Sequence, residues 1–110
     1  MKVLVIWKAL VSEVYHKRFK ELARLKDVEL AIIVPAKWQK TRLEKKYCNE
    51  YKIIPRKVIF NGFNHFHWYP GLAEVVRQIR PDIIHIEEEH YSLVTHQAIR
   101  LAKRYNAKCL

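Results

Sequence analysis

The amino-acid sequence predicts an α/β domain in which helices cover both faces of a mainly parallel sheet of four or five strands. Short apolar runs alternate along the chain with amphipathic segments of helical length. The apolar runs are nearly continuous, which is typical of strands that are buried on both faces. Strands that alternate with helices are joined by right-handed crossovers, and such crossovers produce a parallel sheet.

The first two strands carry the strongest signal. Residues 2–7 form an apolar run after a short polar start, and residues 28–34 form a second run. Pro35 should end the second strand, because proline lacks the N–H that a central strand donates. Ser12 is a candidate cap for a helix between the two strands. Apolar side chains recur there at helical spacing: Val11, Tyr15, Phe19 and Leu22.

The middle of the chain has weaker patterns. Residues 36–51 have a weak helical periodicity and predict a strongly basic helix. Residues 57–60 form a short apolar run that predicts the third strand, and an irregular aromatic stretch follows over residues 61–69.

The last third of the chain returns to a clear alternation. Pro70-Gly71 opens a helix whose apolar face carries Leu72, Val75, Val76 and Ile79. The remaining elements are a strand over residues 82–86, a helix over residues 94–105 and the start of a fifth strand at residues 108–110. Together these elements predict one Rossmann-like, three-layer domain over residues 1–110, with strand order 3-2-1-4-5 and an incomplete C-terminal end.

The formal net charge of +10 is unevenly distributed. Residues 37–57 hold eight basic and two acidic residues, whereas residues 82–90 hold four acidic residues and no Lys or Arg. This segregation makes nucleic acid an unlikely partner for the chain as a whole. The basic segment can still be interpreted as a solvated face, as a track for a phosphate backbone or as a contact with acidic lipid.

Other features bound the class of protein. The apolar run at residues 3–7 is too short to span a bilayer, and no cleavable leader precedes it, so we expect a cytoplasmic protein. Cys48 and Cys109 have no metal-ligand or redox spacing and are expected to be ordinary thiols. Abundant charged residues and scarce Gly and Gln are typical of a thermophilic source.

Several segments together resemble a known family. They are a helix ending in Glu21-Leu22-Ala23, the sequence Pro81-Asp82-Ile83-Ile84-His85-Ile86-Glu87, an acidic-aromatic loop and Ser92-Leu93-Val94. With them the chain resembles, over essentially its whole length, the N-terminal domain of family 4 retaining glycosyltransferases with the two-domain B-type fold. The Pro-Asp-Ile-Ile-His part is the specific one.

The resemblance implies a truncated homologue that contributes the acceptor side of an active-site cleft. It implies a sugar acceptor as ligand, and no sugar transfer by this chain alone, since the donor-binding domain of the family has no counterpart here. Neither a cofactor nor a metal is expected. The chain departs from the family in its first strand-to-helix loop, which contains no glycine.

Five polar residues lie at or shortly after the ends of strands and are the candidate substrate-binding residues: Glu87, His85, His90, Lys8 and Ser12. Ligands of parallel sheets bind at the carboxyl ends of the strands. On a strand, His85 and Glu87 should point to one side and Glu88 to the other. The alternatives that involve no ligand are that Glu88 and Glu89 stabilise a helix N-terminus and that Lys8 is solvated.

The aromatic stretch at residues 61–69 leaves several interpretations open. Its rings could stack on a sugar or on bases, close over the core, or pack in a subunit interface. His65 and His67 have a metal-site spacing, but no third ligand lies nearby in the sequence.

Two alternatives to the glycosyltransferase interpretation remain. The chain could be a small basic module that binds nucleic acid, or an oligomeric scaffold. An apolar fourth strand that only residues 108–110 cover would be a poorly protected edge. We therefore expect a homodimer or a complementing partner chain.

Overall fold

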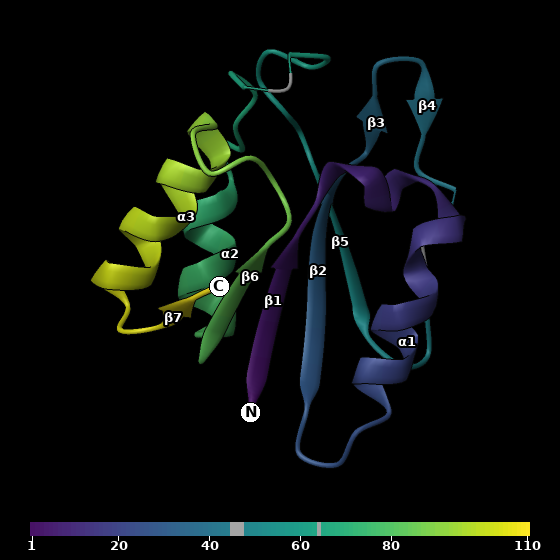
Figure 1. Cartoon of the computed structure of the whole chain (residues 1–110), viewed down its shortest axis with the longest axis vertical. Helices are drawn as coiled ribbons and strands as arrows, with labels where there is room; N and C mark the ends of the chain where they lie inside the picture. The colour runs from purple at the N-terminus through teal and green to yellow at the C-terminus, as the bar shows by residue number, and fades with distance from the viewer. Residues whose placement is uncertain (45–47, 64) are drawn as a thin grey trace.

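Five parallel strands form the central sheet of the computed structural model, which describes residues 1–44, 48–63 and 65–110 (Figure 1). The strands are β1 (Lys2–Ile6), β2 (Glu29–Pro35), β5 (Lys52–Arg56), β6 (Ile83–Ile86) and β7 (Lys108–Cys109). Their spatial order is β5-β2-β1-β6-β7, which is the predicted order 3-2-1-4-5. The predicted α/β class with a mainly parallel sheet is confirmed.

Helices cover the sheet in three layers. The helices α2 (Leu72–Ile79) and α3 (Leu93–Arg104) pack on one face. The helix α1 (Lys17–Ala23) packs on the other, together with the 3-10 turns η1 (Lys8–Val11) and η2 (Glu13–His16). Strand β1 is buried on both faces, which explains the continuous apolar run at residues 2–7. Leu4 and Ile6 belong to the core under α2 and α3, and Val3 and Val5 belong to the core under α1.

Among the described residues, no helix has the length and apolar character needed to cross a membrane.

The first helix begins later than expected. The chain makes the two 3-10 turns before α1, and the Ser12 side chain forms no capping hydrogen bond. Leu10 and Val11 are both buried, as is His16 in the second turn. A single α-helical face could not bury these positions together, because adjacent residues of a helix point about 100° apart. Only Lys17–Ala23 keeps the expected helix, with Phe19 buried.

The expectation of a basic helix at residues 36–51 was wrong. Residues Lys37–Trp38 (β3) and Thr41–Arg42 (β4) form an antiparallel hairpin, with Gln39 in the left-handed region (φ 53°) at its turn. Residues 45–47 of the expected helix, which include Lys45 and Lys46, lie outside the described residues.

The third strand is Lys52–Arg56 rather than the predicted residues 57–60. Strand β5 lies at the edge of the sheet, so Ile53 and Ile54 are only half-buried and Pro55 is tolerated. Ile59, from the expected strand, instead forms an antiparallel bridge with Trp68.

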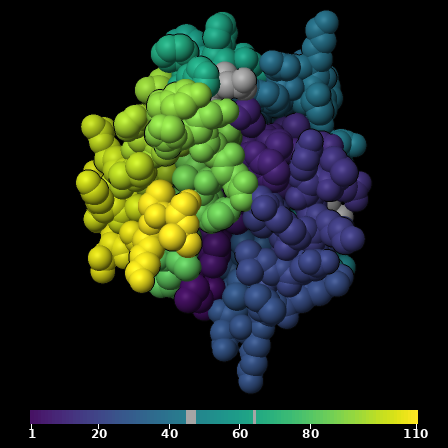
Figure 2. Space-filling model, in the orientation of Figure 1, coloured from purple at the N-terminus to yellow at the C-terminus, as the bar shows by residue number. Residues whose placement is uncertain are grey.

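The loop of residues 57–69 stands beside the β3–β4 hairpin at the upper end of the molecule in Figures 1 and 2. Asn64, within this loop, lies outside the described residues.

The C-terminal elements match the sequence closely. Helix α2 ends at a left-handed Arg80 (φ 52°), and α3 begins at Ser92, whose Oγ accepts a hydrogen bond from the Thr95 N–H at 3.3 Å. Two-residue β7 then pairs with β6.

A buried polar pair secures the segment before α1. The Nε2–H of His16 donates to the Leu10 carbonyl oxygen at 2.7 Å, so Nδ1 is left to accept from the Tyr51 hydroxyl at 2.5 Å. His16 is fully buried and Tyr51 is 5% exposed. Burial raises the pKa of the Tyr51 hydroxyl well above its usual range, so it stays a donor.

Replacing Tyr51 by Phe should lower the free energy of unfolding by about 1–3 kcal/mol, because it removes a hydrogen bond inside the core. The matched control is Tyr15→Phe on an exposed ring, which should cost less than about 0.5 kcal/mol. Urea denaturation followed by circular dichroism measures both. Equal losses in the two variants would contradict a structural role for the pair.

Candidate functional site

The candidate site lies where β1 and β6 end. The chain leaves these neighbouring strands toward opposite faces of the sheet, because β1 leads to α1 and β6 leads to α3. Loops diverge at such a position, and parallel sheets bind their ligands there. The two loops are residues 7–12 and residues 87–92, both at the carboxyl edge (Figure 1).

The space between the two loops is filled by an ion pair. The Nζ of Lys8 lies 2.5 Å from Oε1 of Glu88, and the Lys8 N–H donates to Oε2 at 2.9 Å. The Glu88 side chain is fully buried, and that of Lys8 is 16% exposed. We call these two residues the buried pair. It occupies the crevice in which a sheet of this type would hold a phosphate.

Aromatic and imidazole rings surround the buried pair. His67 Nε2 lies 3.6 Å from Glu88 Oε2, and the Trp38 ring stands edge-on to His67, with centroids 4.8 Å apart. Burial alone would raise the pKa of Glu88, but interactions with His67 and Lys8 outweigh it and hold that pKa below its usual value. Burial, together with the Glu88 charge, raises the pKa of Tyr69. The site is therefore built to keep one carboxylate ionised out of contact with water.

A second, partly exposed cluster lies on the other side of the same loop. His85 Nε2 lies 2.8 Å from Oε1 of Glu87, so these two side chains do point to the same side. Arg18 of α1 also forms an ion pair with Glu87. The Arg18 guanidinium lies 5.3 Å from the centre of the Trp7 ring. Glu87 is thus held between two nitrogen donors and remains 25% exposed.

This cluster borders a surface hollow of about 550 Å³. The hollow is lined by Trp7, Val14, Tyr15, Lys17, Arg18, Glu21 and Glu87. The Trp7 and Tyr15 rings meet edge to face at 5.2 Å. The hollow therefore combines aromatic surface with two carboxylates, a guanidinium group and an ammonium group.

The five predicted residues do not form one site. Glu87 and His85 lie together, whereas Lys8 belongs to the buried pair. His90 is exposed and its ring stands edge-on to Tyr91, with centroids 5.0 Å apart. Ser12 lies between the two 3-10 turns.

Sequence reasoning missed four residues of the site, which are Glu88 as a buried ion-pair partner, Arg18, Trp7 and Tyr15. Strand alternation was a usable signal for Glu88, because it places Glu88 opposite Glu87. Arg18 is 69 residues from Glu87 in sequence, so nothing local could pair them.

The His65-x-His67 spacing does not bring the two rings together. His67 is buried beside Trp38, whereas His65 is exposed against Tyr91. In the part of the chain that the structure describes, no group of three or more His, Cys, Asp or Glu side chains is arranged to hold a metal ion.

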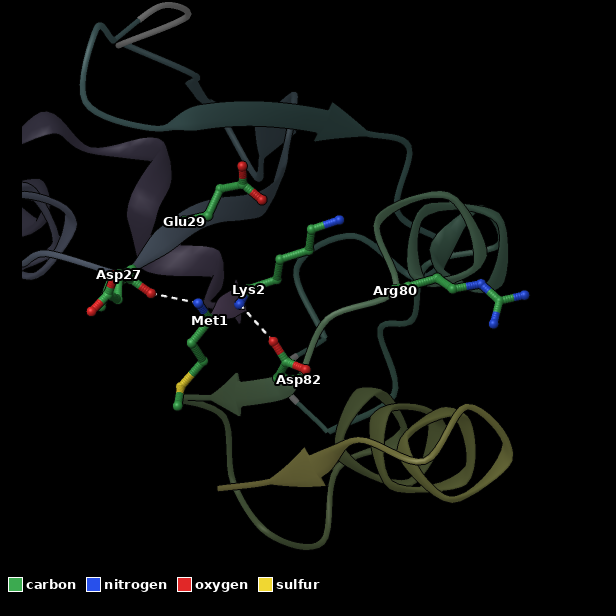
Figure 3. A pocket seen from close by; sticks show the side chains of 7 residues that line it. Met1, Lys2, Asp27, Glu29, Arg80 and Asp82 are labelled. Atoms are coloured by element: carbon green, nitrogen blue, oxygen red, sulfur yellow. Dashed lines mark hydrogen bonds between the residues drawn. The ribbon is translucent and has the colours of Figure 1, made fainter.

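Another hollow, of about 620 Å³, lies at the opposite edge of the sheet (Figure 3). The Met1 amino group donates to the Asp27 carbonyl oxygen at 2.5 Å, and the Lys2 N–H donates to Asp82 Oδ2 at 2.8 Å. These bonds anchor the start of β1. We interpret this hollow as structural, because it lies at the amino ends of the strands.

Replacing Lys8 by Met should lower the free energy of unfolding by about 3–5 kcal/mol, because it leaves a buried carboxylate without its cation. Adding Glu88→Gln to this variant should restore part of the loss. Lys17→Met on the exposed surface of α1 is the matched control and should change stability by less than about 0.5 kcal/mol. Urea denaturation at neutral pH measures all three variants, and a double variant no more stable than Lys8→Met would contradict the assignment.

The same variants should differ in their response to acid. The folded-state pKa of Glu88 lies below its ordinary 4.5, so its contribution to stability is full above that pH and is lost as the pH falls through the folded pKa. Without Lys8, burial should raise the folded pKa, so protonation would then favour the folded state. The difference in the free energy of unfolding between wild type and Lys8→Met should therefore become smaller as the pH falls. A difference independent of pH would refute an ionised, buried Glu88.

Comparison with protein-family models, with curated proteins and with solved structures found no match to this chain. The resemblance to glycosyltransferases therefore stays a prediction.

Proposed function

We propose that this chain is a glycosyltransferase homologue that binds a sugar acceptor in the hollow beside Glu87. One observation carries the proposal. The hollow joins the Trp7 and Tyr15 rings to the carboxylate of Glu87 at the carboxyl ends of β1 and β6.

The chemistry of the hollow suits a carbohydrate. Aromatic rings offer apolar surface to the C–H face of a sugar, and ionised side chains form strong hydrogen bonds with its hydroxyl groups. Arg18 and His85 hold Glu87 in place, so its carboxylate need not be ordered on binding. Pre-ordered polar groups lower the entropic cost of binding.

The buried pair argues against a nucleotide-sugar donor at the same edge. A phosphate bound at the end of β1 needs close approach to backbone N–H groups. Here the Lys8 N–H already donates to Glu88, and residues 7–12 include no glycine. The observations therefore support a sugar acceptor as the ligand better than a nucleotide-sugar donor.

Titration of the isotope-labelled chain with a panel of oligosaccharides, followed by nuclear magnetic resonance, tests the proposal. We expect shifts at Trp7, Tyr15 and Glu87, and affinity about tenfold weaker in Glu87→Gln, because a hydrogen bond to a charged group is lost. Glu29→Gln, at the exposed amino edge of the sheet, is the matched control.

Two results would count against the proposal. One is equal weakening in Glu87→Gln and Glu29→Gln, which would remove the hollow as the binding site. The other is the absence of shifts at Trp7, Tyr15 and Glu87 with every oligosaccharide of the panel, which would refute acceptor binding in the hollow.

We also propose that the chain forms a homodimer through β7. This strand is an edge of the described sheet and pairs with β6 over only two residues. Beside it lies a hollow of about 390 Å³ lined by Phe19 and Ile83, and Leu110 is 65% exposed. Exposed strand edges invite pairing, and two antiparallel copies of one edge satisfy two-fold symmetry.

Light scattering at micromolar concentration should give the mass of two 13.3 kDa chains. Leu110→Lys should shift the population to single chains, because it places a charge in the apolar part of the contact. Phe66→Lys, at a similarly exposed apolar residue in the loop of residues 57–69, should not. A wild-type mass of one chain would refute the homodimer.

A further inference from the structure

Three phenylalanine side chains stand exposed at the carboxyl edge of the sheet. Phe60 is 58% exposed, and Phe63 and Phe66 are each 59% exposed. Beneath them the bridge between Ile59 and Trp68 closes the loop, with N–O distances of 3.0 and 3.2 Å. We call Phe60, Phe63 and Phe66 the aromatic tip.

One residue of the aromatic tip, Phe60, has a strained backbone conformation. Phe60 has a φ of 57°, which is uncommon for a bulky side chain, and its carbonyl oxygen accepts from the Phe63 N–H at 3.1 Å. Backbone strain of this kind persists where the surroundings enforce it, and it is frequent at binding sites. In water an exposed ring gives no burial energy in return, so a binding role accounts for both features.

A basic hairpin is fastened to the aromatic tip. Lys37, Lys40 and Arg42 of the β3–β4 hairpin are exposed. Asn61 Oδ1 accepts from the Gln39 N–H at 2.6 Å, and Asn61 Nδ2 donates to the Lys37 carbonyl oxygen at 2.5 Å. The two hydrogen bonds hold the hairpin turn and the aromatic tip as one unit, side by side in Figure 2.

The charged side chains of this unit are all basic. Residues 36–42 and 57–69 contain four basic residues and no Asp or Glu. Of the nearby acids, Glu44 follows the hairpin by two residues and accepts a hydrogen bond from the Glu13 N–H, and Glu88 is buried and paired with Lys8. The partner of this surface should therefore carry negative charge and accept apolar rings.

We propose that the aromatic tip and the basic hairpin dock the protein on an anionic lipid surface. Aromatic side chains enter the interface between headgroups and acyl chains, while Lys and Arg bind the lipid phosphates. Exposed apolar groups beside basic ones are what such a contact requires.

The ring geometry favours lipid over single-stranded nucleic acid. Successive bases stack on aromatic faces along a groove. The Phe60 and Phe63 rings instead stand at 84° to each other, with centroids 6.4 Å apart, and none of the hollows described above includes the tip. Insertion into a lipid interface imposes no such stacking order. The proposal does not rest on sugar binding at Glu87.

Flotation of the full chain with vesicles of phosphatidylcholine, with and without phosphatidylglycerol, tests the proposal. We expect recovery with the anionic vesicles, little with the neutral ones, and loss at high salt. Lys37→Gln and Lys40→Gln should each weaken partitioning about fivefold. Phe63→Ser with Phe66→Ser should weaken it at least about tenfold, because two rings no longer insert.

Matched controls separate docking from folding. Leu25→Ser with Lys26→Gln changes an exposed apolar and an exposed basic residue at the opposite edge of the sheet and should leave partitioning unchanged. Phe60→Gly should relieve the left-handed backbone and so keep or raise the melting temperature, while it weakens partitioning. If Phe60 had a purely structural role, its replacement would not keep or raise the melting temperature while weakening the partitioning to vesicles.

Three outcomes would overturn the proposal. They are no recovery of the wild-type chain with anionic vesicles, equal weakening by the Leu25 and Lys26 control, and binding of a single-stranded oligonucleotide instead of vesicles. The last outcome would assign the surface to nucleic acid.

Discussion

The ion pair between Lys8 and Glu88 is the interaction on which the carboxyl edge of the sheet depends. It joins the loop after β1 to the loop after β6, at the place where the two diverge. Because Glu88 turns inward to Lys8, the alternation of an extended chain turns Glu87 outward to Arg18 and His85. One buried contact thereby determines which carboxylate is buried and which stays partly exposed.

The same division into an inner and an outer side applies to residues 57–69. His67 and Tyr69 face inward and complete the surroundings of Glu88, and Trp38 of the hairpin packs against His67. The phenylalanines of the same loop face outward. Charge follows this division, because Lys8 and Arg18 pair with the three glutamates after β6, whereas residues 36–42 of the hairpin segment contain basic residues and no acidic one. The acids of the carboxyl edge thus lie around the two cations, and its rim is basic.

How far the sequence predicts this structure depends on burial and on distance along the chain. Strand β1 and helix α2 were predictable because burial on two faces, or on one helical face, leaves a regular apolar pattern. Strand β5 was missed because an edge strand is half-exposed and here contains Pro55. The β3–β4 hairpin has strands of two residues, too short to show any period. The proximity of His85 and Glu87 followed from local alternation, whereas the contact of Glu87 with Arg18 follows from the packing of α1.

The hollow beside Glu87 and the aromatic tip with its basic hairpin are built from segments that follow successive strands of one sheet. Trp7 follows β1, the β3–β4 hairpin follows β2, the aromatic tip follows β5 and Glu87 follows β6. In a parallel sheet all these segments must emerge at the same edge. A ligand bound beside Glu87 and a surface bound by the aromatic tip would therefore meet the protein from the same end. If both proposals hold, the acceptor is best understood as one presented at an anionic surface, because the edge that binds the sugar is also the edge that the basic rim draws toward negative charge.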